Sequence, residues 1–288
     1  MKNTDHMLCL GYGYTARHFA DKLEAIGWNV TGSTRNSDKI SEIKRGGANA
    51  IVWNGEPLRR DLLEGKTGLL ISAAPTADGC PVLNAAIQTP RVLDQLKWIG
   101  YLSTNGVYGD HQGARVDETS ELRGTSNRAL WRIAAEKQWR AFAELRELRL
   151  HIFRLPGIYG PGRSAFDKIR NGTARRLYKP GQMFSRMHVD DIATTLCASV
   201  MQNHPEPVFN LCDDEPGPPQ DVVSFACALL GVEPPPLIPI EDANISDMAR
   251  SFYADNKRVC NQRMKDALGI KLRYPTYREG LPAVLEAE

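Results

Sequence analysis

The sequence lacks the patterns that mark metal-binding, disulfide-rich and membrane-spanning proteins. It has six cysteines, with no Cys-x-x-Cys pair among Cys9, Cys80, Cys197, Cys212, Cys227 and Cys260. Such scatter predicts reduced thiols, several of them packed as small apolar side chains, in a cytoplasmic protein with no metal site. No apolar run approaches the roughly 20 residues of a membrane span, and the polar stretch 1–6 has no apolar signal core.

A surplus of charge of one sign is also missing. The chain has 36 Lys and Arg against 34 Asp and Glu, a net charge of +2, which is too small to indicate a nucleic acid or membrane partner. With 288 residues, 42% of them hydrophobic, the chain can bury a core in one large or two small domains. We therefore expect a small-molecule partner, and neither nucleic acid nor membrane.

A glycine turn near the N-terminus organises the sequence. The apolar run 7–10 enters Gly11 and Gly13, and an amphipathic stretch follows. Gly11 permits a tight turn, and Gly13 lacks the Cβ that would keep a pyrophosphate from the backbone. The helix that begins with Tyr14 and Thr15 would direct free N–H groups and its positive end at that anion. Strand, glycine turn and helix in this order predict a dinucleotide site.

The second predicted strand, 28–33, ends without the acidic residue that NAD-selective sites use to hold the ribose hydroxyls. Thr34 and Arg35 stand there instead, and a guanidinium suits a 2′-phosphate. The pattern therefore favours NADP, with NAD as the alternative. A solvated surface arginine is the other interpretation of Arg35.

Strands and helices alternate through the first half of the chain. Further strands are predicted at 50–53, 68–72, 98–103 and 150–155, with helices at 37–45, 81–96 (broken at Pro90) and 127–148. This alternation predicts an α/β fold, a doubly wound parallel sheet of Rossmann type over 1–155. A smaller C-terminal α/β lobe, 156–288, is expected to bind the substrate. Its predicted elements are helices at 190–201, 219–230 and 256–268 and a strand at 208–211.

Four later segments carry a family resemblance. They are 102–109, which ends in Val-Tyr-Gly, the loop 154–163, the segment 188–193 and the segment 209–216. Together with the glycine turn they resemble the extended short-chain dehydrogenase/reductases, the group of nucleotide-sugar epimerases and dehydratases. The similarity covers nearly the whole chain in the right order.

The resemblance extends the predicted cofactor site. Ala73, Ala74 and Pro75 follow a buried strand, and their small side chains would let a cofactor lie against the backbone. Matching the family's strand and loop motifs adds three more cofactor residues, Ser103, Pro156 and Ile158.

The family's chemistry uses a Ser or Thr, a Tyr and a Lys, and this chain keeps only part of that set. Thr104 matches the hydroxyl member, while the Tyr position falls on Arg128 and the Lys position on Arg132. Arg132 could still hold the nicotinamide ribose. Arg128 cannot exchange a proton near neutral pH, because its pKa exceeds roughly 12, but it could bind an anionic substrate group bidentately.

Three hypotheses follow from the missing tyrosine. Another group, Tyr108 or Tyr159, supplies the proton; the protein binds NADP without turnover; or the substrate needs little acid from the protein. Asn105 and Gly106 replace the Asp-Glu pair of the family's dehydratases, which argues against sugar 4,6-dehydration.

The sequence thus predicts an NADP-binding oxidoreductase or epimerase of extended short-chain type. Its substrate would be a small polar or nucleotide-linked carbonyl or alcohol, which could be anionic. The alternative is a non-catalytic, NADP-binding regulatory protein. The family also implies a homodimer through the long helix 127–148.

Three residues near the motifs are expected to be structural rather than catalytic. His188 is predicted to form hydrogen bonds where the two lobes meet. Asp190 or Asp191 is predicted to cap the following helix. Arg154 is predicted to anchor the sixth strand.

Overall fold

A computed structural model describes residues 5–89, 91–202 and 204–288. Its centre is a seven-stranded sheet in the order β11-β7-β5-β4-β1-β2-β3, with every neighbouring pair parallel. These strands are β1 (His6–Leu10), β2 (Asn29–Thr34), β3 (Asn49–Val52), β4 (Gly68–Ile71), β5 (Trp98–Thr104), β7 (Leu150–Leu155) and β11 (Val208–Asn210). The order reverses between β1 and β4, so the predicted doubly wound sheet is confirmed.

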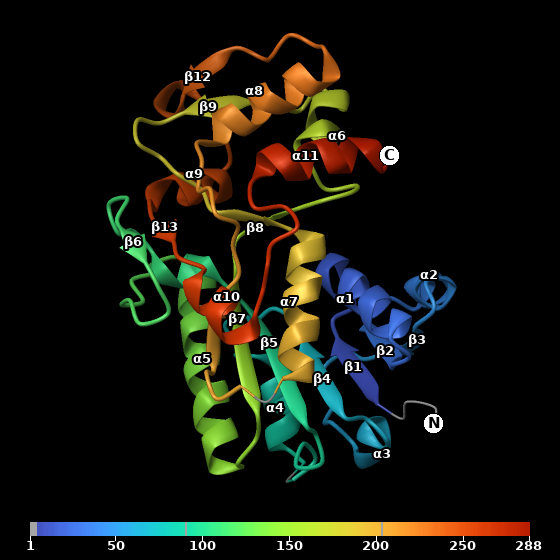
Figure 1. The fold of residues 1–288 in the computed structure, drawn as a ribbon. Helices are drawn as coiled ribbons and strands as arrows, with labels where there is room; N and C mark the ends of the chain where they lie inside the picture. Colours follow the sequence, from blue (N-terminus) through green and yellow to red (C-terminus); the bar gives the residue numbers. More distant parts are fainter. Residues whose placement is uncertain (1–4, 90, 203) are drawn as a thin grey trace.

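Helices cover both faces of the sheet (Figure 1). One face carries α1 (Tyr14–Ala25), α7 (Val189–Met201), α2 (Ile40–Arg45) and α10 (Gln262–Leu268); the other carries α3 (Arg60–Leu63), α4 (Pro81–Ile87) and α5 (Asn127–Leu145). Alternate residues of β1 separate the two cores, because Met7 and Cys9 pack with α1 and α7, whereas Leu8 and Leu10 pack with α4 and α5. In the described part of the chain no helix is long and apolar enough to cross a membrane.

The second lobe lies beyond the carboxyl ends of the strands (Figure 1). Two small parallel sheets pair β8 (Gly157–Tyr159) with β10 (Arg186–His188) and β9 (Arg176–Tyr178) with β12 (Leu237–Pro239). Its helices are α6 (Ala165–Arg170), α8 (Pro219–Leu230), α9 (Asp247–Ala254) and α11 (Tyr277–Glu286). The chain crosses between the lobes repeatedly, since α7 and β11 follow β10 in sequence yet pack with the large sheet.

A short ladder ties the lobes together at one edge. β13 (Arg258–Val259) pairs with β6 (Arg115–Val116), which lies between η2 (Asn105–Tyr108) and α5. The Asn256 amide donates to the Asp110 carboxylate (2.9 Å), and the Lys257 ammonium donates to the Gly109 carbonyl (2.9 Å).

Two predicted helices differ from the observed ones. The helix expected at 81–96 ends at Ile87, and the expected break at Pro90 lies outside the described residues. The helix expected at 256–268 begins only at Gln262, because the residues before it form β13 and bond to the 109–114 loop.

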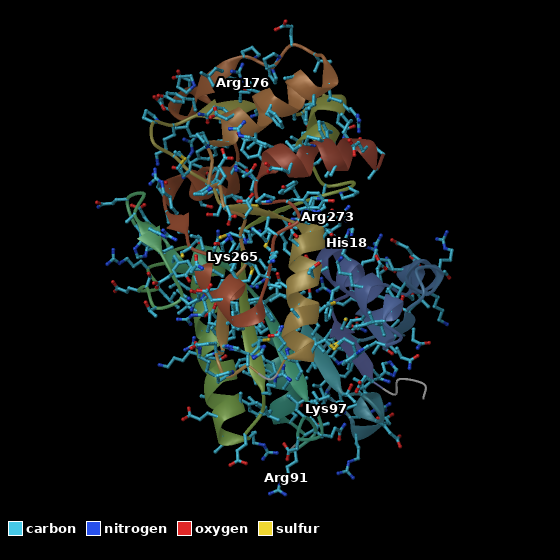
Figure 2. All side chains as sticks on the ribbon, viewed as in Figure 1. His18, Arg91, Lys97, Arg176, Lys265 and Arg273 are labelled. Atoms are coloured by element: carbon cyan, nitrogen blue, oxygen red, sulfur yellow. The ribbon has the colours of Figure 1, made fainter. Side chains whose placement is uncertain are left out.

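The residue that caps α7 differs from the predicted one. His188 is the N-cap, and its Nδ1 accepts from the Asp190 amide (3.1 Å), so the expected structural role of His188 is confirmed. Asp191 instead accepts the amides of Arg273 (2.8 Å) and Tyr274 (2.9 Å), and Asp190 pairs with Lys22 (2.7 Å). The aspartates thus fix neighbouring segments to α7, and Arg273 marks this corner in Figure 2.

Candidate functional site

The glycine turn leaves an open space at the start of α1. Gly11 has φ +96°, and a Cβ there would lie 2.9 Å from the Ala73 amide nitrogen at the end of β4. Gly13 is the N-cap of α1; it forms no side-chain cap, and a Cβ built on it has nothing within 4 Å. The first turn of α1 contains no acidic residue. The free amides and the open approach fit a pyrophosphate.

The tip of β2 lies beside this turn. Ser33 is buried, and its Oγ accepts from the Gly11 amide (2.9 Å). Thr34 is half-buried, and its Oγ1 accepts from the Asn36 amide (3.1 Å), while Arg35 is exposed. The Gly11 backbone therefore lies against the end of β4 on one side and is bonded to the end of β2 on the other. These contacts place the start of α1 between the ends of β2 and β4.

The other predicted cofactor residues gather at the same edge of the sheet. Ala73 donates its amide to the Leu10 carbonyl (3.0 Å), which holds the loop 73–75 against the glycine turn. Pro156 and Ile158 follow β7 and are half-buried. All these positions stand at the carboxyl ends of β1, β2, β4, β5 and β7, where open α/β sheets bind ligands.

Thr104 ends β5 with a half-buried side chain. Its Oγ1 accepts from the Gly106 amide (3.1 Å) and caps η2. The hydroxyl proton has no acceptor in the described part of the chain, so it is free to hydrogen-bond to a ligand.

The two arginines at the family's Tyr and Lys positions lie on one face of α5, four residues apart. Arg128 is exposed and forms no ion pair with any residue that the structure describes. Arg132 is half-buried, donates to the Leu102 carbonyl of β5, and lies 5.9 Å from the Tyr101 ring centroid.

A buried polar network lies directly beneath these residues. Arg154 of β7 and Glu136 of α5, each 2% exposed, form a 2.7 Å ion pair. Ser103 donates to the other Glu136 oxygen (2.5 Å), and Arg154 also donates to the Tyr108 hydroxyl (2.9 Å). Burial alone would lower the pKa of Arg154, but the bonds and charge of Glu136 raise it. The network ties α5 to β5, β7 and η2.

Tyr108, one of the two candidate proton donors, is fully buried. Its hydroxyl donates to Asn210 Oδ1 (2.7 Å), and burial raises the pKa of Tyr108 to about 12, although the charge of Arg154 offsets part of the rise. Tyr159 is 9% exposed and donates to the Thr276 carbonyl (3.4 Å). Both phenols have protein acceptors, so their geometry favours structural roles over proton donation. Arg154 anchors its strand as expected.

Sequence reasoning missed the far side of the network. The Asn210 amide donates to Glu118 (2.7 Å), and the Asn210 side chain donates to the Cys260 carbonyl (3.1 Å). Asp213 is 2% exposed, and within the described residues its carboxylate oxygens have no hydrogen-bond partner. Burial raises the pKa of Asp213 to about 8, and the positive charge of Arg186 opposes the rise. The signal in the sequence was the 209–216 segment of the family resemblance, which contains Asn210 and Asp213.

Substitutions at Gly11 and Gly13 should have different effects on the free energy of unfolding. We expect Gly11→Ala to lower the free energy of unfolding by about 2–4 kcal/mol, because its positive φ and the close Ala73 amide leave no room for a Cβ. Gly13→Ala should stay within about 1 kcal/mol of wild type, because its Cβ meets nothing. Urea denaturation measures both, and equal losses would contradict the open space at Gly13.

The ion pair gives a second stability test. Glu136→Gln should lower the free energy of unfolding by about 3–5 kcal/mol, because it leaves the buried Arg154 charge unpaired. Glu144→Gln, on an exposed position of the same helix, is the control and should change little. The double variant Glu136→Leu with Arg154→Met removes both charges and should recover part of the loss. A Glu136→Gln protein as stable as wild type would show that the pair does not hold α5.

Comparisons with known proteins agree with this architecture. No protein-family model matches the sequence. A functionally unknown conserved protein from Silicibacter pomeroyi DSS, whose structure is solved, is 48% identical, with 98% of each chain covered and a TM-score of 0.91. Protein YeeZ of Escherichia coli (strain K12) is 26% identical over 281 residues, 92% of this chain and 95% of YeeZ.

Two structures of lower identity share the fold. The dTDP-glucose 4,6-dehydratase of Bacillus anthracis str. Ames in complex with NAD is 17% identical, covers 98% of this chain and 95% of its own, and has a TM-score of 0.77. The human epimerase family protein SDR39U1 (isoform 2) with NADPH is 18% identical, covers 98% and 100%, and has a TM-score of 0.74. The chain therefore belongs to the same family as the Silicibacter pomeroyi protein, and it has the fold of the extended short-chain dehydrogenase/reductases, the NAD(P)-dependent epimerases and dehydratases.

Proposed function

We propose that the protein is an NADP(H)-dependent oxidoreductase or epimerase of extended short-chain type. The substrate would be a small polar or nucleotide-linked carbonyl or alcohol. The observation that carries the proposal is the uncapped start of α1, where Gly13 leaves the first amides open to an anion beside the switch point of the sheet. Tyr14 and Thr15 supply those amides, and the backbone at 73–75 forms the opposite wall.

The preference for NADP rests on the tip of β2. The turn 33–36 has hydroxyl, guanidinium and amide groups but no carboxylate, so nothing there would repel a 2′-phosphate. Arg35 is exposed and free to form a bidentate pair with it, and Thr34 adds a hydroxyl. The human neighbour's complex with NADPH supports this preference, whereas the bacterial dehydratase's complex with NAD supports the alternative.

The bound nicotinamide would accept or donate a hydride. Thr104 would donate its free hydroxyl proton as a hydrogen bond to the substrate oxygen and polarise the carbonyl. Arg132, held against β5 by the Leu102 carbonyl, would bind the nicotinamide ribose with its remaining donors. Arg128 would bind an anionic group of the substrate. Because Tyr108 and Tyr159 are engaged, the proton at the substrate oxygen would exchange with water.

One observation favours the alternative, a non-catalytic NADP-binding regulatory protein. Neither candidate proton donor, Tyr108 or Tyr159, has a free hydroxyl, and an arginine occupies the position of the family's catalytic tyrosine. The predicted homodimer through α5 is supported by two exposed leucines on that helix, Leu130 (49% exposed) and Leu145 (80%).

The cofactor preference can be tested at one side chain. Arg35→Ala should weaken NADPH binding about tenfold or more and leave NADH binding nearly unchanged, because only NADPH carries the 2′-phosphate. Titration followed by nicotinamide fluorescence measures both affinities. Lys44→Ala, an exposed cation of α2, is the matched control and should change neither. Equal losses for the two cofactors would remove the 2′-phosphate role.

Turnover can be tested at Thr104. If a carbonyl screen finds NADPH oxidation, Thr104→Val should lower kcat about 100-fold, because it removes the only hydrogen bond that this residue can give the substrate. The affinity for NADPH should stay at the wild-type value. Unchanged kcat would exclude Thr104 as the polarising group. Saturable NADPH binding without oxidation by any substrate in the screen would favour the regulatory alternative.

A further inference from the structure

A tight turn of the second lobe packs against the start of α1. Gly160 and Arg163 exchange two backbone hydrogen bonds, of 3.2 and 3.0 Å, around Pro161 and Gly162. Gly162 has φ +68°, and proline followed by a glycine of positive φ is the signature of a type II turn. The backbone hydrogen bonds and the Pro-Gly pair therefore define the shape of the turn.

Tyr14, the first residue of α1, holds this turn in place. Its hydroxyl donates to the Pro161 carbonyl (3.0 Å). A Cβ at Gly160 would lie 2.6 Å from the same hydroxyl, so only glycine allows the turn to come this close. His18, one helical turn further along α1, packs edge-on against the Tyr14 ring (4.8 Å between centroids) and marks this corner in Figure 2.

The turn places a cation at this corner. The Arg163 guanidinium carbon lies 5.5 Å from the Tyr14 ring centroid, and the side chain is exposed. Its neighbour Asp167 is occupied elsewhere, because one carboxylate oxygen accepts from the amide (2.6 Å) and the hydroxyl (2.9 Å) of Ser164. Arg163 forms no ion pair with any residue in the described ranges. Its charge and its N–H donors are therefore available to a ligand.

We propose that Arg163 binds the pyrophosphate of the cofactor, with its guanidinium oriented by the Tyr14 ring. The inference rests on the proposed function, since it assumes that a dinucleotide lies at the glycine turn. Tyr14 would then serve twice, because its backbone amide is at the open end of α1 and its ring carries Arg163. A guanidinium fork matches two phosphate oxygens, and stacking on an aromatic ring limits the conformations that it loses on binding.

The two lobes would then share the cofactor. The amides of α1 come from the sheet domain, whereas Arg163 comes from the loop between β8 and α6. Arg163 would contact a group that NADPH and NADH have in common, so it should strengthen both, unlike Arg35. This difference separates the inference from the proposed choice of NADP.

The test compares two stacked arginines of the same lobe. Arg170 lies 5.8 Å from the Phe166 ring, is exposed and pairs with Glu288, so Arg170→Ala is the matched control for Arg163→Ala. We expect Arg163→Ala to bind both NADPH and NADH about tenfold more weakly, and Arg170→Ala to bind both as wild type does. Arg163→Lys keeps the charge without the planar fork and should recover part of the loss. Fluorescence titration gives all the affinities, and matching melting temperatures show that the variants are folded.

A second variant tests the role of the Tyr14 hydroxyl, which holds the turn that carries Arg163. Tyr14→Phe keeps the aromatic surface and removes only the bond to the Pro161 carbonyl, so we expect a loss of about threefold for both cofactors.

The outcomes separate the inference from the proposed function. If the wild-type protein binds the dinucleotides and Arg163→Ala binds them with the same affinity, the inference is wrong and the proposed function stands. A loss for NADPH alone would also overturn it, because Arg163 would then contact the 2′-phosphate. Wild-type protein that binds neither cofactor would overturn the function and the inference together.

Discussion

The buried ion pair between Glu136 and Arg154 is the interaction on which the structure at the carboxyl ends of β5 and β7 depends. Two charges that are 2% exposed carry a large desolvation cost, and only a closed set of hydrogen bonds offsets it. Ser103 and Tyr108 complete that set with bonds of 2.5 and 2.9 Å. Because Glu136 belongs to α5 and Arg154 to β7, the pair fixes the helix against the strands. The orientation of Arg132, one turn earlier on α5, follows from it.

The network also accounts for the behaviour of Tyr108. In an open loop this phenol could reach a substrate, but here Arg154 and Asn210 bind its hydroxyl within the core. The hydroxyl oxygen of Thr104, four residues earlier, accepts from the Gly106 amide, and its proton has no acceptor among the described residues. The site therefore keeps the hydroxyl member of the family's set, Thr104, and has two arginines where the family resemblance predicts a phenol and an ammonium. Under the proposed function, such a set would bind and polarise a substrate oxygen, and the proton would exchange with water.

Much of the fold could be predicted from the sequence, because the period of its strands and helices is local information. The run 7–10 is apolar at every position, as a strand buried on both faces requires, and it is observed as β1. Both ends of α8, at Pro219 and Leu230, agree with the prediction, because a proline starts the helix and Gly231 in the left-handed region ends it.

The parts of the fold and the site that could not be predicted depend on contacts between distant segments. Strands of two or three residues, such as β6 and β13, have no period of their own and exist only as pairs. Likewise, no local pattern shows that Asn256 bonds to Asp110 instead of starting a helix. In the site, the glycine turn was readable because its chemistry is local. The burial of Tyr108 was not, because it depends on Asn210, which is 102 residues away.

We infer that the start of α1 binds the pyrophosphate of a nicotinamide dinucleotide. Titration of wild-type protein and of Gly13→Val with NADPH, followed by nicotinamide fluorescence, tests it most directly. We expect saturable binding by wild type and none by Gly13→Val, because the new side chain would fill the space that is open beside Gly13. Equal binding by the two proteins, or binding by neither, would contradict it.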